Sequence, residues 1–308
     1  MKRVFVTGAS GFIGAALVKR LVAQNISVAV LQSGKTPGRR LAAIADKLRF
    51  IERAKGTTES LRDSLLEWAP DTVFHLGWGG VSNVDRNDAA LQSGNVAFTV
   101  ELAQMCVACG VEQFVGAGSQ AEYGKKDSQI AETECPAPTT LYGAAKLSSC
   151  FLSERICELE GVRHAWLRIF STYGPDDNPD WMLPSLIRKL SAGERPPLTL
   201  GEQQWDYLYV DDAAAAFIAA AAARINGIYN LGSGKAVSLR ALIETVRDKI
   251  DPKLELGFGE VAYRPDQVMH LEANIEKLRA TSGWSPEISL SDGLAETTRW
   301  FGSNKNAV

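Results

Sequence analysis

The sequence predicts an α/β fold, in which a doubly wound parallel sheet stands beside a smaller mixed α/β lobe. Short apolar runs alternate with helical patterns through the first half of the chain, and this rhythm changes after Gly174. Such alternation implies right-handed crossovers, and therefore a parallel sheet with helices on both faces. Ligands of such sheets bind beyond the carboxyl ends of the strands.

The expected elements follow one another closely. Apolar runs of strand length occupy Arg3–Thr7, Ser27–Leu31, Arg49–Ile51, Thr72–Leu76, Gln113–Ala117 and Arg163–Ile169. Helical spacing of apolar residues covers Phe12–Gln24, Ser60–Trp68, Ser93–Cys109 and Leu141–Glu160. Prolines divide the chain after Gly174 into short pieces, and regular alternation returns at Asp206–Val210, Ala213–Ala223 and Ile228–Leu231.

Composition argues against several classes of function. The 308-residue chain has a formal net charge of -3, so no global basic field suggests a nucleic-acid partner. Its apolar runs are too short for a signal peptide or a membrane span. Five cysteines, with the lone pair Cys106 and Cys109 and only three histidines, indicate neither a disulfide framework nor a metal site. We expect a cytoplasmic protein with no metal and no membrane partner.

A glycine-rich segment directly follows the first strand and opens the first helix. Glycine lets the backbone approach a pyrophosphate closely, and the helix N-terminus supplies free N–H groups with a partial positive charge. A simple glycine-rich turn is the alternative. We predict a dinucleotide site that includes Gly8, Ser10, Gly11, Phe12 and Ile13. Residues 1–174 and 205–233 would then form the dinucleotide-binding domain, and residues 175–204 and 234–308 the substrate lobe.

The end of the second strand bears on the choice of cofactor. NAD sites usually offer an acidic residue there, which accepts hydrogen bonds from the ribose 2′-OH. This chain has Gln32 and Ser33 instead, followed by the cations Lys35, Arg39 and Arg40. A hydroxyl and cations would bind the 2′-phosphate that a carboxylate repels. We expect NADP, held by Gln32, Ser33 and Arg39; NAD is the alternative if the basic cluster is only a solvated loop.

Tyr142 and Lys146 are four residues apart in a helical pattern, so their side chains share one face. A nearby ammonium should lower the pKa of the tyrosine, which is ordinarily about 10. Ser119 follows a strand, where its hydroxyl could bond a substrate oxygen that cycles between carbonyl and alcohol. Singly, Ser119 could be a turn residue and Tyr142 a core tyrosine. Together we predict Ser119, Tyr142 and Lys146 as catalytic residues.

The chain resembles the extended short-chain dehydrogenase/reductase family, in particular its NAD(P)-dependent nucleotide-sugar epimerases, dehydratases and reductases. The resemblance spans nearly the whole chain and rests on TGASGFIG (7–14), HLG (75–77), GNVAFT (94–99), GSQAEYG (118–124), YGAAK (142–146), LRIFSTYGP (167–175), WDYLYVDD (205–212), YNLGSG (229–234), Arg264 and GWSP (283–286). It implies a Rossmann-type fold and a homodimer formed through the helices Ser93–Cys109 and Leu141–Glu160. Its cofactor site would include Leu76, Gly77, Tyr142 and Lys146, and its substrate site Trp78, Ser119, Gln120, Ser171, Trp205 and Arg264.

Departures from the family pattern narrow the reaction. Dehydratases of the family follow the catalytic hydroxyl with an Asp-Glu pair, where this chain has Gln120 and Ala121, so we do not expect 4,6-dehydration. Glu122, one position further along, should point elsewhere. Ser171 stands for a usual asparagine and Trp205 for a usual arginine, both in the sugar-nucleotide pocket, which leaves the precise substrate open. Arg264 could equally be a surface arginine, and His75 should be structural.

Two reactions of a nucleotide-sugar substrate remain. In a 4-ketoreductase, NADPH gives hydride to the C4 carbonyl of a nucleotide-linked 4-keto-6-deoxyhexose, and Tyr142 protonates the oxygen. In a 4-epimerase, tightly held NAD takes the C4 hydride and returns it to the other face. The absence of an acidic residue at Gln32 favours the reductase. A third hypothesis is a non-catalytic dinucleotide sensor, against which the intact Ser119–Tyr142–Lys146 set argues.

Overall fold

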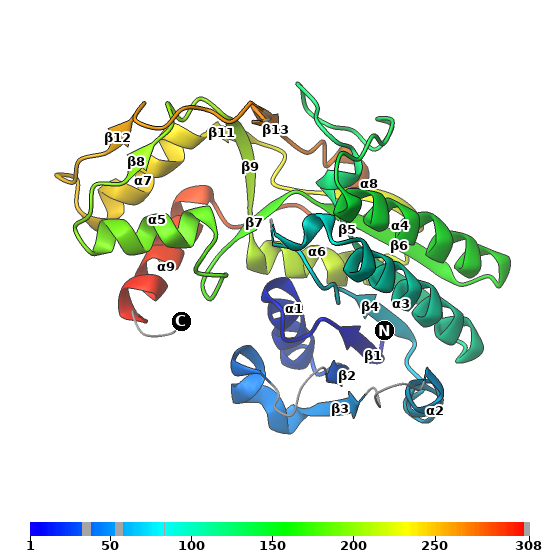
Figure 1. Ribbon diagram of the computed structural model, residues 1–308. Helices are drawn as coiled ribbons and strands as arrows, with labels where there is room; N and C mark the ends of the chain where they lie inside the picture. The colour runs from blue at the N-terminus through cyan, green and yellow to red at the C-terminus, as the bar shows by residue number, and fades with distance from the viewer. Residues whose placement is uncertain (33–37, 53–57, 83, 266, 305–308) are drawn as a thin grey trace.

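The computed structural model describes residues 1–32, 38–52, 58–82, 84–265 and 267–304. Within these residues, the larger sheet has seven parallel strands in the order β10-β6-β5-β4-β1-β2-β3 (Figure 1). The strands are β1 (Arg3–Thr7), β2 (Ser27–Gln32), β3 (Leu48–Glu52), β4 (Thr72–His75), β5 (Gln113–Ser119), β6 (Arg163–Ile169) and β10 (Gly227–Leu231). The strand order reverses between β1 and β4, which creates the switch point where such sheets bind ligands.

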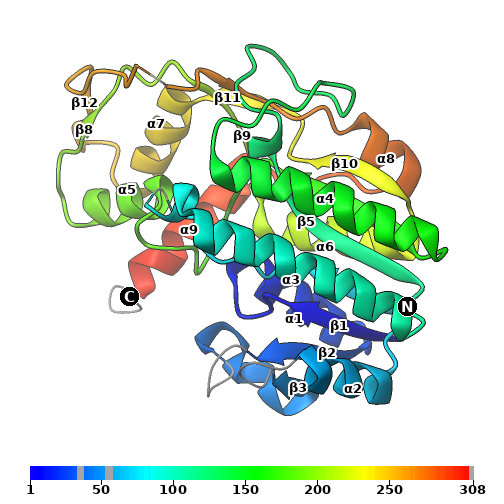
Figure 2. The ribbon, with the colours of Figure 1, turned by 45° about the vertical axis from the view of Figure 1, so that its right-hand side comes forward.

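Helices cover both faces of this sheet, which confirms the predicted doubly wound fold. Val4 and Val6 of β1 face the core formed with α1 (Phe12–Ala23) and α6 (Val210–Ala222). Phe5 faces the opposite core. Figure 2 shows the helices that cover this face of the sheet. These helices are α2 (Thr58–Trp68), α3 (Ala89–Ala108) and α4 (Leu141–Leu159). Both faces of the strand are buried, so its sequence is continuously apolar rather than alternating.

A second, smaller sheet is mixed, as predicted. β9 (Gln204–Tyr209) lies at its centre, antiparallel to β11 (Ala236–Ser238) and parallel to β7 (Ser171–Tyr173) and β13 (His270–Leu271). A short ladder joins β8 (Pro197–Leu198) to β12 (Gly257–Phe258). Beside these strands, α5 (Met182–Ser191), α7 (Leu239–Ile250) and α9 (Leu290–Ser303) share an apolar core of their own, and α8 (Glu276–Ser282) packs near β10 (Figure 1).

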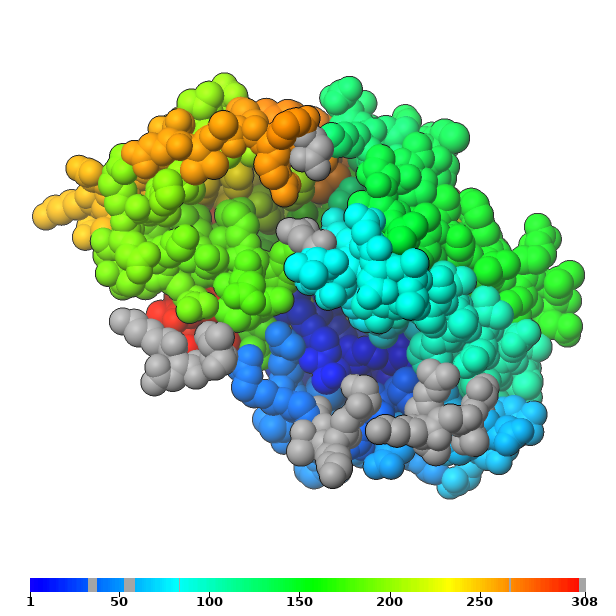
Figure 3. All heavy atoms as spheres, viewed as in Figure 1, coloured from blue at the N-terminus to red at the C-terminus, as the bar shows by residue number. Residues whose placement is uncertain are grey.

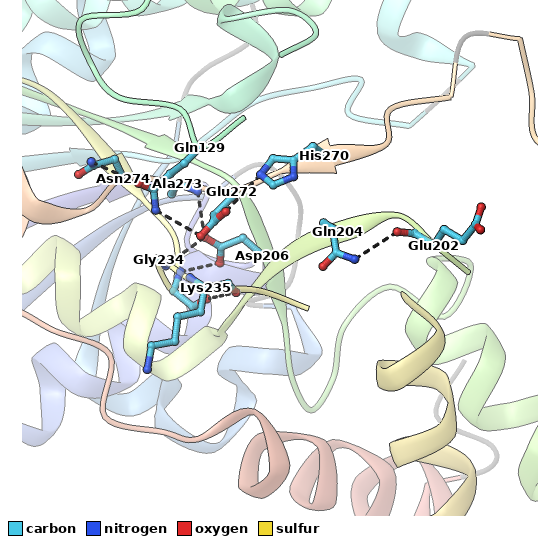
Figure 4. A network of polar contacts seen from close by, with 11 residues as sticks. Gln129, Glu202, Gln204, Asp206, Gly234, Lys235, His270, Glu272, Ala273 and Asn274 are labelled. Carbon is cyan, nitrogen blue, oxygen red and sulfur yellow. Dashed lines mark hydrogen bonds and ion pairs between the residues drawn. The ribbon is translucent and has the colours of Figure 1, made fainter. Parts of the chain in front are cut away.

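The predicted domain division differs from the division into two sheets at β7 and β9. Both strands were assigned to the dinucleotide-binding domain, but they pair with each other in the smaller sheet. A short apolar run predicts a strand without indicating which partner it pairs with. Asp206 anchors β9 there, because its buried carboxylate accepts from the backbone N–H of Ser233 (2.6 Å), Gly234 (3.0 Å) and Ala273 (3.1 Å) (Figure 4).

Two element boundaries differ from the predictions in ways that affect the site. α3 begins at Ala89 rather than Ser93, because the Asp88 side chain caps the helix by accepting from Leu91 N at 2.9 Å. β5 continues beyond Ala117 to Ser119, which remains paired with β6. Ser119 therefore sits on the sheet edge itself. None of the helices in the described part of the chain is both long and apolar enough to cross a membrane.

Candidate active site

The glycine-rich segment forms a close junction with the end of β4. Gly8 has φ +70°, and a Cβ there would lie 2.5 Å from Gly77 N and from the carbonyl carbon of Leu76. The same junction is tied by Gly77 N, which donates to Thr7 Oγ1 at 3.0 Å. A side chain at position 8 would therefore push the glycine loop away from residues 76–77, which the resemblance assigns to the cofactor.

The N-terminus of α1 suits a pyrophosphate. A Cβ at Gly14 would lie 2.1 Å from the Gly8 carbonyl oxygen, so only glycine lets the helix pack this closely. Gly11 is the N-cap, and among the described residues no side chain caps this end or places a carboxylate in the first turn. The backbone N–H groups of the first turn thus remain available to an anion. Figure 3 shows dark-blue N-terminal residues recessed between the cyan segment before α3 and the green smaller lobe.

The other end of the cofactor site differs from the sequence expectation. Arg39 forms an ion pair with Asp176, in the loop after β7, and its guanidinium lies 5.8 Å from the centre of the Trp300 ring. Arg40 donates to the Asp176 carbonyl from Nε (3.0 Å) and Nη2 (2.7 Å), and to the Ser10 carbonyl from Nη1 (3.2 Å). Both arginines already have an anionic or carbonyl partner, which weakens the argument for a 2′-phosphate.

Two further residues of that prediction, Ser33 and Lys35, lie outside the described residues. Gln32 ends β2 and is half-buried, opposite Glu52 in the ladder with β3. Phe12 and Ile13 begin α1 and pack against the core between α1 and α6. Their backbone N–H groups, rather than their side chains, are therefore the groups that could face a cofactor.

The structure brings Ser119, Tyr142 and Lys146 together at the carboxyl edge of the sheet. Ser119 ends β5 and is hydrogen-bonded to Tyr142, which lies in the first turn of α4. Thr140 fixes the start of this helix, because its hydroxyl accepts from Gly143 N at 3.1 Å. One helical turn later, Lys146 Nζ donates to the Ala117 carbonyl at 2.7 Å. All three predicted residues are buried.

Burial changes the proton affinities of this group in a way that the sequence did not predict. Desolvation raises the pKa of Tyr142, and the Ser119 hydrogen bond and the Arg86 charge only partly oppose it. Desolvation also lowers the pKa of Lys146 to about 7, and the charge of Glu122 opposes that change. The predicted lowering of the tyrosine pKa by Lys146 is therefore wrong for this structure.

Trp78 lies against this group and forms one wall of the site. Its ring centre is 3.8 Å from Lys146 Nζ and 6.1 Å from the centre of the Tyr142 ring. Its indole N–H donates to Gln92 Oε1 at 3.0 Å. The next residue, Gly79, is held by both groups of the Asn95 amide, at 3.0 and 2.8 Å. The expected substrate residue Trp78 is thus fixed beside the reacting side chains.

His75 is structural, as predicted. It is buried at the end of β4, with Nδ1 2.7 Å from Thr7 Oγ1 and Nε2 2.9 Å from Thr99 Oγ1. Burial and the nearby charge of Lys146 lower its pKa to about 3, so the imidazole is neutral at ordinary pH. Its two hydroxyl partners fix the strand end that carries residues 76–78.

The remaining predicted substrate residues fall into two groups. Ser171 and Trp205, both departures from the family pattern, contact each other directly, because the indole N–H donates to Ser171 Oγ at 2.6 Å. Gln120 begins the short 3-10 turn η3 (Gln120–Glu122) and is half-buried. Arg264 is exposed on the segment between β12 and β13, in the smaller lobe rather than at the sheet edge that carries Ser119.

Sequence reasoning missed two residues near the site. The guanidinium of Arg86, in η2 (Asp85–Asn87), lies 5.0 Å from the centre of the Tyr142 ring. Asp176 holds Arg39, although 137 positions separate the two residues. Neither contact had a sequence signal, since each joins segments that are distant in the chain. Glu122 does point away from the reaction edge, as expected, but it is buried beneath Ser119.

The chain is similar to characterised nucleotide-sugar enzymes over nearly its whole length. The chain is 28% identical to the dTDP-4-dehydro-6-deoxyglucose reductase of Escherichia coli, over 94% of this chain and 95% of the relative. It is 27% identical to a UDP-glucose 4-epimerase of Mycolicibacterium smegmatis, over 97% and 98% of the two chains. The crystal structure of the Thermus thermophilus UDP-glucose 4-epimerase in complex with NAD superimposes with a TM-score of 0.85 at 26% identity, over 99% of this chain and 100% of that one.

The model of the "NAD dependent epimerase/dehydratase family" matches residues 4–232. This range contains the glycine-rich segment, the strand end at Ser119 and the helix that carries Tyr142 and Lys146. The match covers most of the chain, and the fold is the one expected for this family. The chain therefore belongs to the NAD dependent epimerase/dehydratase family and is an enzyme of the extended short-chain dehydrogenase/reductase type.

Proposed function

We propose that this enzyme is a 4-ketoreductase, which reduces the C4 carbonyl of a nucleotide-linked 4-keto-6-deoxyhexose. One observation carries the proposal: Ser119, Tyr142 and Lys146 converge at the sheet edge, while the two positions after Ser119 hold Gln120 and Ala121. Neither residue can exchange a proton with carbons next to C4. The site thus offers proton transfer at a single oxygen, without the acid and base that dehydration needs.

The residues divide the work of reduction as follows. The nicotinamide, when bound, supplies the hydride. Ser119 and Tyr142 bond the C4 oxygen, and the Tyr142 hydroxyl gives that oxygen its proton. The raised pKa of Tyr142 keeps the phenol protonated until hydride addition makes the C4 oxygen the stronger base. Lys146 contributes a positive charge beside Trp78, where the charge favours both the cofactor and the phenolate that remains.

Reduction of a nucleotide-linked 4-keto-6-deoxyhexose tests this function directly. The purified enzyme should oxidise NADH or NADPH only when the ketosugar is present, and NMR should show one new C4 alcohol. Tyr142→Phe serves as the matched inactive control. Turnover would also dismiss the sensor hypothesis. Consumption of the cofactor without a ketosugar, or no consumption with several nucleotide-linked ketosugars, would contradict the proposal.

A specific observation also favours the 4-epimerase as a second candidate. The arginines expected to hold a 2′-phosphate are bound by Asp176 instead, which removes part of the reason to prefer NADP. The Thermus thermophilus epimerase, at 26% identity, was crystallised with NAD. Mass spectrometry of the native purified enzyme separates the two candidates. Retained NAD together with C4 inversion of a UDP-hexose would support the epimerase; an empty enzyme that needs added cofactor would support the reductase.

We also propose that two copies associate through α3 and α4. The outer surface of α4 carries large apolar side chains, Phe151, Leu152 and Leu159, which are 50%, 46% and 73% exposed. Leu152 and Leu159 are seven positions apart and therefore lie on one helical face. Light scattering should give a dimer mass for the wild type and a monomer mass for a Leu152→Lys, Leu159→Lys variant. A dimeric double variant would place the interface elsewhere.

A further inference from the structure

Glu122 is a fully buried carboxylate directly beneath the reaction edge. Its Oε1 accepts from the backbone N–H of Ser119 at 2.8 Å and from the indole N–H of Trp166 at 2.9 Å. Its Oε2 accepts from Arg168 Nε at 2.6 Å. A buried charge is tolerated only when it is paired and hydrogen-bonded, so this set of donors holds the carboxylate in one position.

Glu122 and Lys146 hold the same strand end at neighbouring points. Lys146 Nζ binds the carbonyl of Ala117, and Glu122 binds the N–H of Ser119, two residues further along β5. Gly118 lies between them, and a Cβ there would lie 2.7 Å from Glu122 Oε1. Glycine at this position therefore lets the carboxylate approach the backbone.

The Ser119 hydroxyl is oriented by the same contacts. Ser119 is the N-cap of η3, and its Oγ accepts from Ala121 N at 3.2 Å while the Glu122 side chain binds back to the Ser119 backbone. This reciprocal capping box fixes the backbone and the side chain together. The hydroxyl that meets Tyr142 thus depends on Glu122 for its position.

Within the described part of the chain, the other titratable groups around Lys146 provide no opposing anion. His75 on β4 is neutral, since its pKa is about 3. Tyr142 and Cys150 on α4 both have raised pKa values and stay protonated. Arg168 on β6, paired with Glu122, and Arg86 in η2, over the Tyr142 ring, are cations. Glu122 favours the charged form of Lys146 against desolvation.

We propose that Glu122 is a positioning residue, which holds Ser119 against Tyr142 and maintains the positive charge of Lys146 during the reaction. It acts through these residues and touches no substrate. The proposal rests on the proposed roles of Ser119, Tyr142 and Lys146, and it adds a requirement for a buried anion behind them. Trp166 is near both charges, with its N–H on Glu122 and its ring centre 6.0 Å from Lys146 Nζ.

The pH dependence of kcat provides the test. In the wild type, kcat should fall as pH rises through about 7, because Lys146 then loses its proton. Glu122→Gln removes the anion, which lowers the pKa of the lysine further. The alkaline limb should therefore move to lower pH by about one unit. Glu112→Gln is the matched control. Glu112 pairs with Arg224 at 2.6 Å beside the start of β5, at the opposite end of the strand from Ser119. Its loss should leave the alkaline limb of the kcat profile at the wild-type pH.

Two companion variants separate charge from folding. Glu122→Gln leaves Arg168 buried without its partner, so this variant should melt at a lower temperature. Adding Arg168→Met should recover much of the melting temperature but keep the shifted limb. Arg168→Lys retains Glu122 opposite a cation, so its limb should match the wild type even if it melts earlier.

The outcomes are decisive in either direction. The proposal would be overturned if the alkaline limb of the kcat profile stays at the wild-type pH in both variants that lack Glu122. It would also be overturned if the limb shifts in proportion to the loss of melting temperature in all variants, including Arg168→Lys. If Glu122→Gln does not fold, the double variant and Arg168→Lys decide. A Tyr142→Phe enzyme with wild-type turnover would instead contradict the proposed reaction site, which is a separate failure.

Discussion

Two charge clusters flank the proposed cofactor site, and they differ in burial. Arg168 and Glu122 lie inside the larger sheet, with side chains 2% and 0% exposed. Arg39 and Asp176 join the two lobes at the surface, with side chains 55% and 19% exposed. Water screens the second pair but not the first. The buried pair can therefore fix catalytic geometry, whereas the surface pair can adjust affinity without supporting the fold.

The largest expected effect concerns the reaction that the buried cluster supports. Tyr142→Phe removes only the transferable proton and should lower kcat by about 100- to 10,000-fold. Cofactor affinity should change little, because the ring and its contact with Trp78 remain. Steady-state kinetics together with cofactor titration would measure both quantities. Turnover within a few-fold of wild type would mean that another group donates the proton.

Loss of a partner within the buried pair should strongly destabilise the fold. Arg168→Met leaves the Glu122 carboxylate buried without its guanidinium and should lower the free energy of unfolding by about 3–5 kcal/mol. Arg224→Met is the control, since its pair with Glu112 is 53% and 58% exposed and should be worth about 1 kcal/mol or less. Urea unfolding compares the two variants. Equal losses would show that burial does not set the strength of these pairs.

A smaller effect is expected at the surface cluster, on cofactor choice. Asp176→Asn removes the carboxylate that occupies Arg39 and stands 3.6 Å from Arg40 Nε. The freed Arg39 guanidinium should bind NADP more tightly by roughly tenfold, as one added charge-assisted hydrogen bond would, while Arg40 keeps its bonds to the carbonyl of residue 176. Affinity for NAD should hardly change, and the gain should shrink as salt is added. Titration of both cofactors at two salt concentrations measures this, and an unchanged preference would leave Asp176 without a role in it.

The smallest effect should be on stability at the same cluster. Arg39→Met breaks a largely exposed ion pair and should change the free energy of unfolding by less than about 1 kcal/mol. The guanidinium also lies 5.8 Å from the centre of the Trp300 ring, a cation–π contact that the variant loses. Urea unfolding in low and high salt checks the value. A loss as large as that of Arg168→Met would mean that this contact holds the lobes together.

The fold class and the family could be predicted from the sequence alone, and so could the three side chains, proposed as catalytic, that meet at the sheet edge. Local patterns sufficed for these predictions, because the geometry of a glycine turn before a helix depends only on nearby residues. In the same way, two residues four positions apart in a helix share one face. Within the motif, Gly8 and Gly14 are positions where a Cβ would collide with the backbone of the structure. The predicted boundaries of α3 and β5 were wrong by a few residues, because the Asp88 cap extends the helix and pairing with β6 extends the strand.

Tertiary structure alone decided which charges meet and how deeply they are buried. Arg39 looked like a phosphate ligand, until the fold placed Asp176 from the other lobe beside it. Lys146 was expected to lower the pKa of Tyr142, but desolvation of both side chains outweighs that interaction. Electrostatic energies depend on distance and on the surrounding dielectric, and neither can be read from the order of residues in the chain.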